Sequence, residues 1–232
     1  MKMKTISLLL SSLLLTIMCT AQIQYIPAAA HRFDVGIGGG VTTLFGDLPK
    51  KVLKPAACAN FDYNFSPYFS IGLQGQIGSL AEGNRDIYSS SLGLYSETKF
   101  KAANINVRAA LGLLLPKPEN RLQDFIHNIY IGAGAGWVSS KIDNIVTTYA
   151  TLNDQPISGT VTYETSELII PVNAGVDMDL PVYGLGINLN LQYNFTRSEA
   201  LDGYDFFIGA NKHSDGYGMA SISLKYYFGR MR

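Results

Sequence analysis

Residues 185–196 read LGINLNLQYNFT, and apolar and polar side chains alternate along the whole stretch. A period of two predicts a β-strand whose two faces meet different surroundings. The apolar face carries Leu185, Ile187, Leu189, Leu191, Tyr193 and Phe195. In a soluble sheet the polar face would meet bulk water, whereas in a membrane barrel it would line a small interior and the apolar face would meet lipid. A single strand leaves both interpretations open.

The N-terminus predicts export. Lys2 and Lys4 precede an apolar run from Ile6 to Met18, and small residues follow up to Ala21. This is the layout of a secretory signal peptide, so we expect a signal over 1–21 and a mature domain over 22–232. Cleavage there would leave Cys58 as the single cysteine, which excludes an intramolecular disulfide.

Composition narrows the class of exported protein. The chain has 18 basic and 18 acidic residues and a net charge of zero, which argues against nucleic acid as a partner. Beyond the signal no stretch of about 20 uninterrupted apolar residues occurs, so the sequence predicts no transmembrane helix. The mature protein is therefore expected to be either soluble or a membrane barrel.

The alternation recurs often enough to close a barrel. Strands are predicted over 32–45, 56–63, 68–79, 102–113, 128–139, 167–180, 185–196 and 215–228. Short connections at 64–67 and 181–184 alternate with longer ones at 46–55, 80–99, 140–166 and 197–214, as expected for periplasmic turns and outer loops. We therefore predict an all-β fold, an eight-stranded antiparallel up-and-down transmembrane β-barrel in outer-membrane lipid with both termini in the periplasm.

The two faces of these strands predict two sets of residues. Aromatic residues near strand ends are expected to form interfacial girdles; they are Phe45, Tyr63, Phe69, Trp137, Tyr193, Phe195, Tyr226 and Phe228. Seven charged residues should face the lumen, namely Arg32, Asp34, Asp62, Arg108, Asp177, Asp179 and Lys225. Because an isolated charge there would be costly, we expect these side chains to pair and fill the interior. A narrow conduction path is the alternative.

The connection LPKPENRLQDFIH (115–127) is long, although strand parity places it among the periplasmic turns. It contains two prolines and a predicted short helix from Glu119 to Ile126. One interpretation is a simple insertion. The other is a docking point for a periplasmic partner, with Lys117, Glu119, Arg121, Asp124 and Phe125 as the candidate contact residues.

Several segments resemble a known family. GIGGGVTTLFGDL (36–48), SPYFSIGLQGQIG (66–78), NIYIGAGAGW (128–137) and LKYYFG (224–229) are similar to the small outer-membrane β-barrel domain proteins of Gram-negative bacteria, the eight-stranded relatives of OmpA, OmpX and OmpW. The glycine-rich first strand followed by Gly46 and Asp47 also resembles PorG-like barrels of the type IX secretion machinery. The resemblance implies an outer-membrane location and, for the PorG-like case, membership of a secretion complex.

The sequence contains no group of residues that resembles a catalytic site. His31, His127 and His213 are isolated in sequence, and the glycine run at 36–40 has no following helix to complete a phosphate site. We expect no enzymatic activity, cofactor or metal. The outer loops, including 87–98 and 201–217, are rich in Tyr, Phe, Ser, Asn and Gly, residue types of adaptable contact surfaces. The sequence predicts a membrane anchor or interaction module, with a small-solute channel and a soluble exported β-sandwich as alternatives.

Overall fold

The computed structural model describes residues 31–46, 51–83, 93–149, 156–180, 184–196 and 216–230. The predicted signal peptide, His213 and the connection 197–214 lie outside the described residues. The long strands are β1 (His31–Phe45), β3 (Lys54–Ser66), β4 (Phe69–Gly83), β5 (Gly93–Ala110), β6 (Ile129–Tyr149), β7 (Pro156–Asp179), β8 (Leu185–Thr196) and β9 (Gly216–Arg230). The short elements are β2 (Lys51–Val52), the 3-10 turn η3 (Leu111–Leu113) and helix α2 (Arg121–His127).

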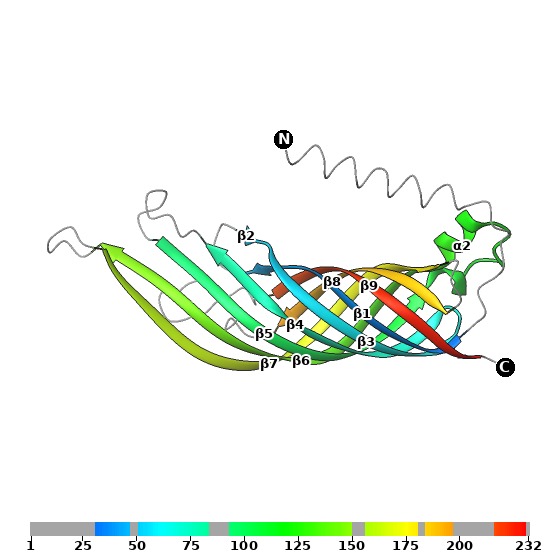
Figure 1. The fold of residues 1–232 in the computed structure, drawn as a ribbon, viewed down its shortest axis with the longest axis horizontal. Helices are drawn as coiled ribbons and strands as arrows, with labels where there is room; N and C mark the ends of the chain where they lie inside the picture. Colours follow the sequence, from blue (N-terminus) through cyan, green and yellow to red (C-terminus); the bar gives the residue numbers. More distant parts are fainter. Residues whose placement is uncertain are drawn as a thin grey trace, which may run out of the picture.

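The long strands form a closed antiparallel ring (Figure 1). Neighbours in the chain pair with each other from β3 to β9, and β1 closes the ring by pairing with both β3 and β9. The two-residue strand β2 pairs with β4 beyond the start of β3. Closure leaves no free sheet edge around the ring. The prediction of an eight-stranded up-and-down barrel is confirmed, and the soluble-sandwich alternative is wrong because one sheet closes on itself.

The outer surface of the ring is apolar. Exposed large apolar side chains from all parts of the wall include Ile37, Phe61, Leu73, Ile105, Ile131, Leu168, Leu191 and Ile222. In β8 the residues Asn188, Asn190, Gln192 and Asn194 are buried in the interior. The polar face of LGINLNLQYNFT thus lines the lumen, and the usual arrangement of a soluble protein is reversed.

The barrel has two different ends. The end that carries His31 and Arg230 also has the tight turn between β3 and β4 and the segment with η3 and α2; we call it the terminal end. At the other end, the loop end, β5, β6 and β7 run well past their neighbours in Figure 1. Ile169 pairs with Thr196, the last described residue of β8, while β7 continues back to Pro156 along β6.

The long strands correct three predicted boundaries. Much of the predicted loops 80–99 and 140–166 continues as strand in β4, β5, β6 and β7. In these extensions polar residues occur on both faces, so apolar and polar residues no longer alternate. The hydrogen-bonded pairing of the strands nevertheless continues. The predicted strand 102–113 ends at Ala110, and residues 111–113 form η3 instead. The predicted helix at 119–126 agrees closely with α2.

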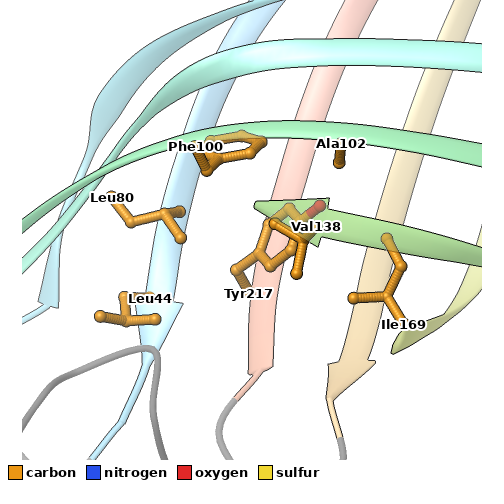
Figure 2. Close-up of a cluster of buried hydrophobic side chains, with 7 residues drawn as sticks. All are labelled: Leu44, Leu80, Phe100, Ala102, Val138, Ile169 and Tyr217. Atoms are coloured by element: carbon orange, nitrogen blue, oxygen red, sulfur yellow. The ribbon is translucent and has the colours of Figure 1, made fainter. Parts of the chain in front are cut away.

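A cluster of apolar side chains lies in the loop-end half of the lumen, beside buried polar residues such as Thr42, Thr98 and Ser140. It comprises Leu44, Leu80, Phe100, Ala102, Val138, Ile169 and Tyr217, all at most 7% exposed. Figure 2 shows these side chains converging from several strands of the wall. We call this cluster the apolar plug. The alternation does not predict it, because these apolar residues occupy inward positions, where the pattern predicts polar side chains.

Candidate functional site

The terminal-end half of the lumen holds a cluster of five charged side chains, which we call the charge cluster. It comprises Asp34, Asp62, Arg108, Asp177 and Lys225. Lys225 Nζ lies 2.9 Å from Asp34 Oδ1, 3.4 Å from Asp62 Oδ2 and 3.3 Å from Asp177 Oδ1. The guanidinium of Arg108 pairs with the carboxylate of Asp62. Lys225 therefore forms ion pairs with carboxylates from β1, β3 and β7.

Three carboxylates face two cations in this cluster, so one negative charge is in excess. The side chains of Lys225, Asp34 and Asp62 are 2%, 2% and 5% exposed, but that of Asp177 is 29% exposed. The excess charge therefore has access to water at Asp177, where a carboxylate is cheapest to keep ionised.

The structure separates two residues of the predicted lumen set from the others. Arg32 is exposed at the beginning of β1, although it shares a strand face with Asp34. Asp179 is exposed at the end of β7 and lines the opening of the lumen. At the rim of a barrel the inward face of a strand no longer implies an enclosed side chain, because the wall ends there.

Glycines on neighbouring strands make room for the large lumen side chains. Lys225 pairs in register with Gly36 of β1 and with Gly186 of β8. A Cβ added at Gly72 would collide with the carboxylate of Asp62, and one added at Gly132 would crowd the stem of Arg108. Gly72 and Gly132 thus leave the space that Asp62 and Arg108 occupy.

An amide layer lies between the charge cluster and the apolar plug. It contains Gln74, Gln76, Asn104, Asn106, Asn173, Asn188, Asn190, Gln192 and Asn194. Asn188 Nδ2 donates to Asp177 Oδ1 at 2.9 Å and connects the layer to the charges. Tyr217 of the plug donates to Gln76 Oε1 at 3.1 Å and connects it to the other side. The lumen is therefore occupied by three contiguous layers of side chains.

The lumen opens at the terminal end into a cavity of about 460 Å³. Asp34, Arg108, Asp177 and Lys225 line its inner wall, and residues of the 115–127 connection line its outer wall. We call it the mouth cavity. It borders the charge cluster, while the amide layer and the plug lie farther along the lumen.

The segment over 111–127 contains η3 and α2 and lies beside the mouth cavity. In α2, Asn120 Oδ1 accepts a hydrogen bond from Gln123 N at 3.0 Å, a standard N-cap. His127 is buried, and its two ring nitrogens lie 2.5 Å from Gln123 O and 2.6 Å from Pro116 O. A neutral imidazole has one N–H, so it can donate to only one of these carbonyls at a time.

Contacts with the barrel fix this segment in place. Ala110 N donates to Tyr68 O at 2.8 Å, and Asp177 N donates to Asn128 O at 3.2 Å. Tyr68 also packs against His127, with ring centroids 5.9 Å apart. Burial, together with the negative charge of Asp124, raises the pKa of Tyr68. Of the predicted docking residues, Lys117, Glu119, Arg121 and Phe125 are exposed and Asp124 lines the mouth cavity; their docking role stays a prediction.

The predicted aromatic residues lie in two groups on the wall. At the terminal end Phe33 packs against Tyr63 and Phe228 with centroids 5.3 and 5.5 Å apart, and Phe69 and Tyr226 lie nearby in the same network. Farther toward the loop end Tyr193 packs against Phe45 at 5.4 Å and Phe195 at 4.6 Å. Trp137 of β6 is 50% exposed. From Phe33 to Phe45, at a tilt of about 40°, β1 rises about 30 Å, the thickness of a hydrocarbon core.

The two described histidines, His31 and His127, contact residues that hold their rings in place. His31 stacks on Tyr227 with centroids 5.7 Å apart, and His127 is held between two carbonyls. Among the described residues no group of three His, Cys, Asp or Glu side chains could hold a metal ion. No helix in the described part of the chain is long and apolar enough to cross a membrane.

A closed ring of strands with an apolar exterior and an interior filled by side chains defines a transmembrane β-barrel. No protein-family description and no curated protein sequence matches the chain. Among solved structures it is similar to neisserial surface protein A, at 10% identity over 86% of this chain and 99% of that chain, with a TM-score of 0.46.

Two further solved structures are similar at the same level. Ail, the attachment invasion locus protein of Yersinia pestis, has 12% identity over 86% of this chain and 99% of that chain, with a TM-score of 0.43. CarO of Acinetobacter baumannii has 12% identity over 82% of this chain and 97% of that chain, with a TM-score of 0.45. The fold class of the present chain rests on its own strand ring and on the two faces of that ring.

Proposed function

We propose that this protein is a non-enzymatic, non-conducting barrel of the outer membrane that anchors a surface for protein contacts. The predicted signal peptide supports export, and the apolar wall between two groups of aromatic residues suits a bilayer. The terminal end would face the periplasm, where the short turns of such barrels lie. The loop-end extension of β5, β6 and β7 would then project outside the cell.

The filled lumen is the observation that carries this proposal. A pore needs a continuous water path, but the side chains of the apolar plug are at most 7% exposed. Eight strands leave an interior that side chains can fill completely. Because the plug closes the lumen beyond the mouth cavity, the small-solute channel is disfavoured relative to the anchor.

The ion pairs of the charge cluster support the absence of catalysis. A catalytic carboxylate needs access to substrate and a suitable partner group. Asp34 and Asp62 are buried in contact with Lys225, so they serve to neutralise a lysine. Asp177 has access to the mouth cavity, but it too pairs with Lys225.

Planar-bilayer recording tests the proposal directly. Purified protein, shown to be folded by heat-dependent gel migration, should give no conductance steps above those of the bare bilayer, while a general porin in the same bilayer does. Stable unitary steps from the folded protein would overturn the sealed barrel and establish the channel. Fractionation of the native cell should place the protein with the outer membrane.

The role in a secretion complex, suggested by the PorG-like resemblance, forms the finer part of the proposal. It is tested by affinity purification from the native outer membrane in mild detergent. Stoichiometric recovery of periplasmic or outer-membrane partners would support it. Recovery of the barrel alone would leave an anchor without a stable complex.

A further inference from the structure

The exposed side chains of the η3–α2 segment (111–127) are unusually apolar for a connection outside the barrel wall. Seven large apolar residues are 38–85% exposed there: Leu111, Leu113, Leu114, Leu115, Leu122, Phe125 and Ile126. Large apolar side chains that gather exposed on one short segment indicate a contact surface with protein or membrane. This patch therefore needs an occupant.

Helix α2 has two distinct faces. Leu122, Phe125 and Ile126 follow the three- and four-residue spacing of one helical face, and all three are exposed. On the opposite side Asp124 lines the mouth cavity and His127 is buried against the barrel. The contacts of His127 and Tyr68 fix which face is turned to the mouth. The apolar face is consequently directed away from the lumen.

The apolar surface of η3 continues the outer face of the barrel wall. Along β5 the outward positions include Ile105 and Val107, which are 46% and 43% exposed. Leu111 and Leu113 follow directly on the end of β5 and are exposed, while Gly112 between them is buried against Tyr68, which lines the mouth cavity. The chain thus leaves the wall with its apolar side still on the side that meets lipid.

We propose that the η3–α2 segment lies in the interface of the periplasmic leaflet, with Leu113, Leu122, Phe125 and Ile126 inserted at the boundary between headgroups and acyl chains. The occupant of the patch is lipid, because the patch is continuous with the lipid-facing wall. A short amphipathic helix with an apolar face is the usual element for this position. The inference rests on the proposed outer-membrane barrel, whose turn end faces the periplasm.

This location gives the mouth cavity a fixed wall. The polar side of the segment, with Lys117 and Asp124, lines that cavity. Lipid contact on the opposite side would hold α2 against the rim without a protein partner. The segment would therefore keep the mouth at one width and the barrel at one depth in the bilayer.

Tryptophan quenching by brominated lipid tests this inference. The chain has one tryptophan, Trp137, on the wall. Phe125→Trp is made in a Trp137→Phe background and folded into phosphatidylcholine vesicles whose acyl chains carry bromine close to the headgroup. Lys117→Trp in the same background is the matched control, because Lys117 lies on the mouth side of the same segment.

We expect the Phe125→Trp variant to lose fluorescence in brominated vesicles to about the extent shown by Trp137 in the wild type, and the Lys117→Trp variant to keep its fluorescence. If Phe125→Trp fails the heat-dependent gel test for folding, Leu122→Trp replaces it on the same face. The inference would be overturned if brominated lipid quenched Trp137 but not the tryptophan on the apolar face of α2, and if aqueous acrylamide readily quenched that same tryptophan. The occupant would then be a periplasmic protein. Absence of quenching at Trp137 itself would instead overturn the membrane barrel, and the inference with it.

Discussion

The two halves of the lumen hold side-chain clusters of opposite chemistry. In the terminal-end half Lys225 and Arg108 are surrounded by carboxylates, and in the loop-end half Leu80 and Phe100 pack in an apolar plug. A lumen too narrow for bulk water must be filled by side chains of one kind or the other. The charges lie next to the mouth cavity, where the side chain of Asp177 is 29% exposed, whereas the plug residues are at most 7% exposed. Strand parity places both sets of side chains in the lumen, but the charges lie at its open end.

This difference predicts different responses to mutation. A buried charge network is strongly coupled, because removing one member leaves its partners buried and uncompensated. An apolar plug responds more locally, because each truncation costs its own transfer free energy and the cavity left behind.

The largest effect is expected for Lys225→Met. The change leaves Asp34 and Asp62 with Arg108 as the remaining cation of the cluster, so the free energy of unfolding should fall by about 3–5 kcal/mol. Urea unfolding of protein folded into vesicles measures it. Lys225→Met combined with Asp34→Asn should recover part of the loss, because one uncompensated carboxylate is removed. A double variant no more stable than Lys225→Met would show that the charges are not coupled.

Leu80→Ala should cost somewhat less, about 2–4 kcal/mol, because it opens a cavity in the apolar plug. Leu73→Ala on the same strand is the matched control. Leu73 is 58% exposed on the outer face, where lipid chains can fill the space, so its truncation should cost much less. Equal losses for the two variants, measured by the same urea titration, would contradict the assignment of inside and outside.

Gly72→Ala should destabilise the barrel by about 1–3 kcal/mol, because the added methyl group would collide with the Asp62 carboxylate. Gly75→Ala is a close control, since an added Cβ at Gly75 meets no atom within 4 Å. We expect Gly75→Ala to be neutral or slightly stabilising. The proposed role of lumen glycines as space for charges would fail if Gly72→Ala were also neutral.

The smallest effect is expected for Tyr217→Phe. It removes the hydrogen bond to Gln76 Oε1 and leaves the ring in the plug, so the cost should be about 1 kcal/mol. In Tyr217→Phe/Gln76→Leu the unpaired Gln76 Oε1 is removed as well, while Gln74 Oε1 keeps the hydrogen bond from Asn104 Nδ2, so much of that cost should disappear. A Tyr217→Phe loss as large as that of Leu80→Ala would indicate that the amide layer and the plug unfold as one network.

The strands of the barrel wall could be predicted from the sequence more completely than the arrangement of the side chains in the lumen. Alternation in LGINLNLQYNFT and seven similar segments was enough to predict the strand number, the antiparallel order and the outer face. Strand ends were less predictable: β5, β6 and β7 continue into polar sequence because backbone pairing does not require an apolar face. The predicted strand 102–113 ends at Ala110, and Leu111 and Leu113 are exposed in the 3-10 turn that follows.

Inside the lumen, parity identified the buried charges but could not say which of them meet. Asp34, Asp62, Asp177 and Lys225 come together through the register between strands far apart in the sequence. Arg32 has the same parity as Asp34 and yet is exposed, because it lies at the rim. The plug was missed because Leu44, Val138 and Ile169 are apolar residues on the inward face, where the pattern predicts polar ones.

The sealed lumen is the central claim, and Cys58 tests it most directly. Its side chain is 6% exposed in the lumen, with Sγ 3.5 Å from Ser223 Oγ, and it would be the one cysteine of the mature chain. A small charged thiol reagent is added to the folded barrel in vesicles and labelling is followed by mass spectrometry. We predict no labelling of the native barrel and complete labelling after unfolding in urea. Rapid labelling of the native barrel would mean that water fills the lumen, and it would contradict the account.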